Sequence, residues 1–146
     1  MTRKPFHKIV LVIVVILVVI WHFWSLQYSP LPWFDETFFA SITHSLMNGQ
    51  GFHLAVCPIQ TNGEQVLIYG PVYFLLTTLS SSIFGFGIMS IRMVNLIGAI
   101  ISLFIFYRII RQLSLPTWVT ISVTLLLMFD FIFNQNAHSG RMDLLA

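Results

Sequence analysis

The sequence predicts an all-α polytopic membrane protein, and three observations predict it. Of its 146 residues, 57% are hydrophobic and only 8% are charged, whereas soluble domains carry about a quarter charged residues. The apolar residues gather in long, nearly uninterrupted runs. The basic residues lie in small groups at the ends of these runs, which indicates membrane orientation rather than a nucleic-acid-binding surface. We therefore expect the lipid bilayer, and no nucleic acid, as a partner.

The first predicted transmembrane helix covers residues 9–26. Arg3, Lys4 and Lys8 precede a run about long enough to cross the hydrocarbon core. A cleaved signal peptide is the competing interpretation, but it requires a shorter apolar region followed by small residues, and this run ends in aromatic residues at 21–24. We therefore expect an uncleaved anchor with the basic residues in the cytoplasm and residue 27 outside.

Two further transmembrane helices are predicted, at residues 88–111 and 115–134. If residues 70–84 also crossed the membrane, Arg108 and Arg111 would lie outside, against the preference of basic residues for the cytoplasm. The segment at 70–84 is short for a span and suits an interfacial or re-entrant helix. The chain is then a single membrane domain, residues 1–146, with three spans.

The first outer loop, residues 27–87, is expected to carry two juxtamembrane helices. Asp35 can cap the N-terminus of an amphipathic helix at 36–48, which ends before Gly49. The second juxtamembrane helix is the one at 70–84. The helix at 36–48 is expected to lie flat on the membrane.

The middle of this loop carries weaker signals. Residues 52–56 and 65–68 flank a Thr-Asn-Gly-Glu turn and permit a short hairpin, although Pro58 limits its pairing. Cys57 is the single cysteine of the chain, so no internal disulfide holds this loop.

Two neighbouring acids, Asp35 and Glu36, are the first candidates for chemistry, because the whole chain has only five acidic residues. Asp35 can act as a general base toward a hydroxyl or as a ligand for a hard divalent cation. The alternative is that it only caps the helix. Glu36 points elsewhere from the next position and suits the dipole of the helix or a substrate contact.

The second outer loop is predicted to begin at residues 135–146, on the same face as the acid pair. Its candidates are Arg141, which can hold a phosphate, and Asp143, which can bind a divalent metal or a sugar hydroxyl. An ordinary polar loop with a local ion pair is the alternative. His138 joins them as a candidate substrate contact, and Arg92 can reach lipid phosphates from the outer end of the second span.

One more acid lies in the third predicted span. Asp130 is four residues before Asn134, a spacing at which the two side chains can share a hydrogen bond within a helix. An acid at that depth is a functional candidate of second rank. His44 and His53 match no compact metal-ligand spacing and are interpreted as surface residues.

The order of these elements resembles the start of the large GT-C glycosyltransferases, in the branch that uses polyprenyl-phosphate sugars. This branch includes the aminoarabinose transferases of lipid A and the protein O-mannosyltransferases. The resemblance covers nearly the whole chain, and the segments that carry it are WFDET at 33–37, NG at 48–49, GPVYFL at 70–75, FG at 84–85, SIRM at 90–93 and SGRMD at 139–143.

The resemblance implies a catalytic carboxylate at Asp35 and a second aspartate of the active centre at Asp143. It implies inverting transfer of a sugar from a polyprenyl or dolichyl phosphate to a hydroxyl of a lipid, glycan or protein. A divalent cation bound by the two aspartates is the expected cofactor. We expect the site on the outer face of a bacterial plasma membrane, with the endoplasmic reticulum membrane as the alternative.

Two departures from the family are visible. The aminoarabinose transferases carry a Glu-Lys-Pro triplet where this chain has Tyr69-Gly70-Pro71. The family's enzymes also have many more spans, which predicts that these residues are the N-terminal portion of the enzyme and inactive alone. The competing function is a non-catalytic membrane component that binds a lipid-phosphate sugar or a partner subunit.

Overall fold

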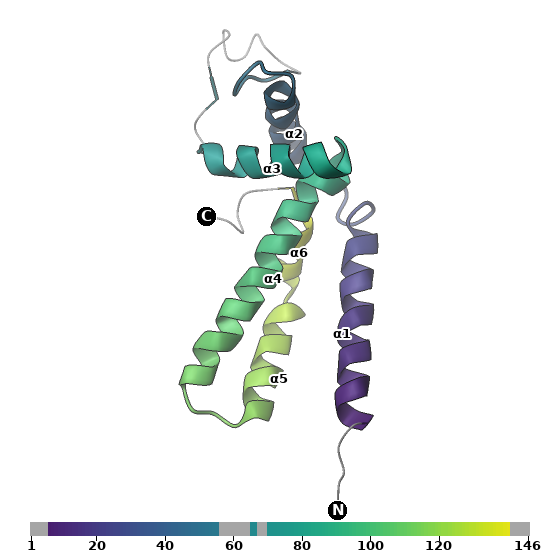
Figure 1. Ribbon diagram of the computed structural model, residues 1–146, viewed down its shortest axis with the longest axis vertical. Helices are drawn as coiled ribbons and strands as arrows, with labels where there is room; N and C mark the ends of the chain where they lie inside the picture. The colour runs from purple at the N-terminus through teal and green to yellow at the C-terminus, as the bar shows by residue number, and fades with distance from the viewer. Residues whose placement is uncertain (1–5, 56–64, 67–69, 141–146) are drawn as a thin grey trace, which may run out of the picture.

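The regular secondary structure of the described residues is entirely α-helical, as predicted. The computed structural model describes residues 6–55, 65–66 and 70–140, and these contain no β-strand. Six helices follow one another along the chain (Figure 1): α1 (Phe6–Ser25), α2 (Phe34–Met47), α3 (Pro71–Phe84), α4 (Ile88–Gln112), α5 (Thr117–Met128) and α6 (Phe131–His138).

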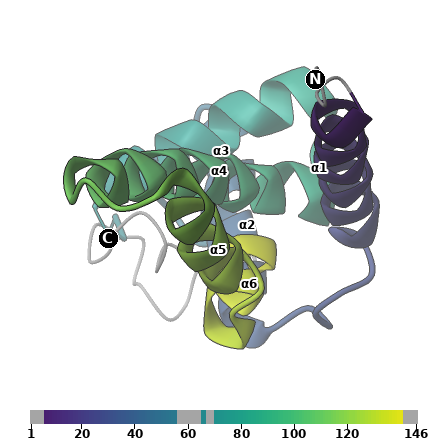
Figure 2. The same ribbon diagram turned by 90° about the horizontal axis from the view of Figure 1, so that it is seen from below.

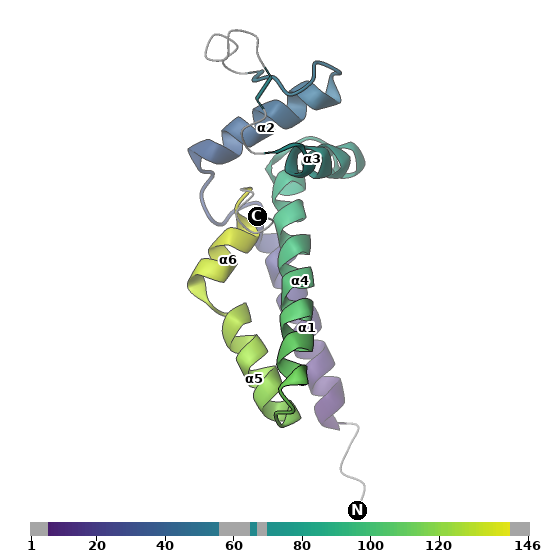
Figure 3. The same ribbon diagram turned by 90° about the vertical axis from the view of Figure 1, so that its left-hand side faces the viewer.

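The molecule is elongated, with two helices lying across one end of three columns. Helix α4, the α5–α6 pair and α1 run along the long axis, and α2 and α3 lie across the end at which α4 begins (Figure 1). Seen from below, α1, α4 and α5 are separate columns (Figure 2). The side view in Figure 3 shows α2 stacked above α3, and α6 reaching toward α2.

Helix α4 is the one helix in the described ranges that is by itself long and apolar enough to cross a membrane. It has 25 residues and is strongly apolar. Helices α5 and α6 qualify only as a pair, bent by 59° where they join. Helix α1 has 20 residues, and its apolar segment Ile16–Ser25 is too short to cross a membrane by itself. The described residues thus contain one membrane-capable helix, or two if the bent pair is one span.

The continuous helix predicted at 115–134 is broken by Asp130. The backbone of this residue is extended, and its carboxylate accepts a hydrogen bond of 2.8 Å from the Phe133 N–H, which caps α6. The amide of Asn134 donates to the carbonyls of Met128, at 2.6 Å, and Asp130, at 3.0 Å, rather than to the predicted carboxylate. Aspartate favours such caps over helix interiors, because its side chain competes for nearby backbone N–H groups.

Helix α2 begins earlier than predicted, so Asp35 is not its cap. Trp33 occupies the cap position, and Asp35 lies inside the first turn. The Trp33 N–H donates instead to a carboxylate oxygen of Glu36, at 3.0 Å. Helix α3 matches its predicted bounds closely, and Gly70 precedes it at a φ of +73°, a backbone conformation that favours glycine.

The layer formed by α2 and α3 has its own small core. Its centre is aromatic: Phe39 of α2 contacts the rings of Tyr73 and Phe74 of α3. The hydroxyls of Thr43 and Thr77 hydrogen-bond across the two helices at 2.7 Å. The full set of buried residues in this core is Phe39, Ile42, Leu54, Val66, Tyr73, Phe74 and Val94. This core fixes α2, which carries the acid pair, upon the start of α4.

Parts of the predicted first loop lie outside the described residues. The Val66 N–H donates to the Phe52 carbonyl at 2.7 Å, which joins the two arms of the expected hairpin. The predicted turn and Cys57 lie in the range 56–64, which is not described. Arg141 and Asp143 of the second loop are likewise outside the described residues.

Candidate functional site

Glu36 joins the two predicted outer loops, although its position in the sequence predicts only a supporting role. Its side chain is 3% exposed. One carboxylate oxygen, Oε2, accepts from the Trp33 N–H. The other, Oε1, accepts from the Gly140 N–H, at the point where the second outer loop begins. The carboxylate therefore joins residues that are 104 positions apart in the chain.

Arg92 of α4 holds this carboxylate through two hydrogen bonds. Its Nε donates to Oε1 and its Nη2 to Oε2 of Glu36, each at 2.8 Å. The same guanidinium donates from Nη1 to the Leu26 carbonyl and from Nη2 to the Pro30 carbonyl, each at 2.8 Å. Arg92 is fully buried and its side chain points into the protein, while its predicted contact with a lipid phosphate stays a prediction.

The surroundings of Glu36 favour its charged form. Burial alone would raise the pKa of the Glu36 carboxyl, but hydrogen bonds from Arg92, Gly140 and Trp33, with the charge of Arg92, outweigh burial and hold the pKa below its ordinary value. A carboxylate that accepts hydrogen bonds from a guanidinium group and from backbone N–H groups is held in a fixed position. These groups therefore hold the Glu36 carboxylate in its charged form.

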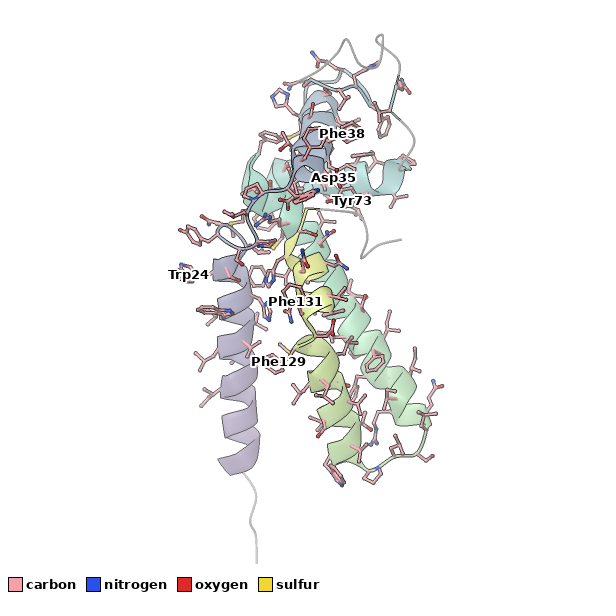
Figure 4. All side chains as sticks on the ribbon, turned by 180° about the vertical axis from the view of Figure 1, so that it is seen from behind. Trp24, Asp35, Phe38, Tyr73, Phe129 and Phe131 are labelled. Atoms are coloured by element: carbon pink, nitrogen blue, oxygen red, sulfur yellow. The ribbon has the colours of Figure 1, made fainter. Side chains whose placement is uncertain are left out.

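Asp35 is the candidate base that remains. It lies in the first turn of α2, at the end of the molecule formed by α2 and α3 (Figure 4), and its side chain is half-buried. The N-terminus of a helix stabilises a negative charge there. Asp35 directly precedes Glu36, so the anchored carboxylate also fixes the backbone that carries Asp35.

The start of the second loop is held by a residue that the sequence did not single out. Asn95 of α4 is fully buried, and its amide donates to the Ser139 carbonyl at 2.5 Å. It also approaches the Asn136 carbonyl at 3.4 Å. Arg92 and Asn95 are three residues apart on one face of α4, and both bind the loops. The sequence signal for this role is Asn95 itself, because it is a polar amide inside an otherwise apolar run.

His138 faces α1 rather than an open cavity. Its Nε2 lies 2.9 Å from Nδ1 of His22, and its Nδ1 lies 3.1 Å from the Asn134 carbonyl. The Ser25 hydroxyl approaches the same Nε2 at 3.5 Å. The structure thus pairs His138 with His22 across the boundary between α1 and α6, while its predicted substrate contact stays a prediction.

The predicted metal ligands are only partly described. Within residues 6–55, 65–66 and 70–140, no group of three or more histidine, cysteine, aspartate or glutamate side chains could hold a metal ion. Asp35 supplies one hard oxygen ligand of the kind that divalent cations prefer. Its predicted partner, Asp143, lies outside the described residues, three positions after Gly140.

Comparison with known proteins adds no family to this description. No model of a known protein family, no curated protein and no solved structure matches the chain.

Proposed function

We propose that this chain is the N-terminal part of a membrane glycosyltransferase. It transfers a sugar from a polyprenyl-phosphate donor to a hydroxyl on the outer face of the membrane. The observation that carries the proposal is the bond between Glu36 and Gly140. This bond joins the turn that carries Asp35 to Gly140, the residue directly before Arg141. The candidate groups of the two loops therefore follow, in the sequence, from two residues that are bonded to each other.

The proposed membrane arrangement has three spans: α1, α4 and the bent α5–α6 pair. Arg108 and Arg111 lie at the far end of α4 from α2 and α3, so the preference of basic residues for the cytoplasm puts α2 and α3 outside. The outer face is then that of a bacterial plasma membrane, with the endoplasmic reticulum as the alternative.

The apolar face of α3 supports this arrangement. Leu76, Leu79 and Ile83 of α3 line a corner of about 270 Å³ together with Ile97 and Ile101 of α4. The exposed apolar side chains of α3 therefore face the same space as those of α4. Such a corner fits a bilayer whose surface lies under α3, with hydrocarbon along α4.

The proposed reaction uses a base, an electrophilic carbon and a leaving phosphate. Asp35 accepts the proton of the acceptor hydroxyl as the hydroxyl oxygen attacks the anomeric carbon of the sugar. The bond between that carbon and the phosphate oxygen breaks, and the lipid phosphate leaves with the electron pair. Arg141 binds the phosphate. A divalent cation held by Asp35 and Asp143 would add positive charge beside the leaving group.

The test is transfer of a labelled sugar from a defined polyprenyl-phosphate donor by the purified full-length enzyme, of which this chain is the proposed N-terminal part, in lipid. Asp35→Asn is expected to lower kcat by about 10²- to 10⁴-fold, the usual contribution of a general base. Asp130→Asn is the matched control, because Asp130 is exposed and asparagine also caps helices. Unchanged transfer by Asp35→Asn would reject the catalytic role. Donor binding without transfer would favour the non-catalytic membrane component.

A further inference from the structure

Four separate parts of the chain meet at the Glu36 carboxylate. They are the connection after α1, the first turn of α2, the first turns of α4 and the residue after α6. Arg92 binds the first of these through the carbonyls of Leu26 and Pro30, and it binds Glu36 through two further bonds. Glu36 in turn accepts from Gly140. All of this lies out of solvent, since Arg92 is 0% and Glu36 3% exposed.

The fit around Gly140 is too close for any side chain. A Cβ atom at this position would lie 2.9 Å from Cγ2 of Ile91 and 3.1 Å from Oε1 of Glu36. The backbone of residue 140 can approach the carboxylate only because glycine carries no side chain. Asn95 holds the preceding residue, Ser139, by its carbonyl. Ser139 and Gly140 are therefore held by Asn95 of α4 and Glu36 of α2.

We propose that Glu36 and Arg92 are positioning residues: through the Gly140 N–H, their ion pair sets where Gly140 and the end of α6 lie relative to Asp35. The inference rests on the proposed function for its catalytic consequence. Glu36 touches no substrate in this role. It holds the Asp35 turn and the segment leading to Arg141 and Asp143 at one separation, so that base and phosphate-binding groups act on the same donor.

The separation of the loops can be measured without any activity. Spin labels at residues 37 and 135, both exposed, report the distance between α2 and α6 by double electron–electron resonance in lipid nanodiscs, with Cys57→Ser as background. The full chain with Glu36 intact is expected to give one narrow distance. Glu36→Gln is expected to broaden it, while Asp35→Asn, which removes a charge one residue away, leaves it narrow.

A second variant covers the case in which Glu36→Gln fails to fold. Gly140→Ala keeps both members of the ion pair but pushes the loop away from Oε1, so it should broaden the same distance. Gly87→Ala is its matched control, since a Cβ at residue 87 meets no atom within 4 Å and its φ of 171° is extended. Equal, narrow distances for Gly140→Ala and Gly87→Ala would overturn the proposal.

Kinetics separate a positioning role from a purely structural one. In the folded fraction, Glu36→Gln and Gly140→Ala are expected to lower kcat by on the order of 10²-fold, the typical effect of misplacing reacting groups by about 1 Å. A structural role alone would lower the yield of folded protein and leave its kcat unchanged, which would overturn the proposal. If the unaltered full-length enzyme transfers no sugar but Glu36→Gln broadens the distance, the proposed function fails and the tie between Glu36 and Gly140 stands.

Discussion

Arg92 and Glu36 form a two-pronged ion pair, Nε to Oε1 and Nη2 to Oε2, both at 2.8 Å, at the buried junction of α2 and α4. Removing one member of a buried pair leaves the other charge without compensation, which typically costs about 3–5 kcal/mol. The remaining donors of Arg92 also bind backbone carbonyls. The pair thus joins α2 and the connection after α1 to α4.

Arg92→Met is accordingly expected to lower the free energy of unfolding by about 3–5 kcal/mol. Thermal or denaturant unfolding in detergent, followed by tryptophan fluorescence, measures the change. In the double variant Arg92→Met/Glu36→Gln, the loss should fall short of the sum of the two single losses, by about 0.5–3 kcal/mol, because the two residues interact. Strictly additive losses would show that the pair contributes no coupling.

Stability should depend on pH through Glu36. Its folded-state pKa is below the ordinary value of 4.5, so its stabilising contribution is fully present above pH 4.5 and is lost as pH falls through the folded-state pKa. The melting temperature of the unaltered chain is expected to fall on acidification below pH 4.5. Glu36→Gln should show a flatter profile over that range. Parallel profiles for the two proteins would contradict the assignment.

The contact between His22 and His138 is expected to hold α1 against α6. Nδ1 of His22 lies 2.9 Å from Nε2 of His138, and the Asn134 carbonyl lies beside Nδ1 of His138. His138→Phe and His22→Phe should each cost about 0.5–1.5 kcal/mol, the usual value of one hydrogen bond. The double variant should cost little more than either single one. A control variant at His44, whose ring lies beside Asn48 and Phe86, tests whether replacing a histidine elsewhere has the same effect.

The helices could be predicted from the sequence because their signals are local. The apolar run of α4 and the Gly-Pro start of α3 fix their bounds within a residue or two. Asp130 was misread because an acid inside an apolar run fits both a helix interior and a new N-terminus, and only the backbone geometry decides. The cap of α2 was misplaced for the same reason, since Asp35 suits both the cap and the first turn.

The long-range bonds of the site could not be predicted in the same way. Arg92 is as compatible with lipid headgroups as with a buried partner, because a long basic side chain at a span end can turn either way. Its actual partner, Glu36, is 56 residues away in the chain. The bond from Gly140 to Glu36 involves a backbone N–H, which every residue except proline has, so no residue type signals it.

The central claim is that α2 and α3, with Asp35, lie on the outer face, opposite the basic end of α4. Single cysteines at residues 37, 112 and 135, in a Cys57→Ser background, test it directly with a membrane-impermeant maleimide on intact cells. Residues 37 and 135 should be modified from outside, and residue 112 only after the membrane is permeabilised. Modification of residue 112 in intact cells, with protection of residue 37, would contradict the claim.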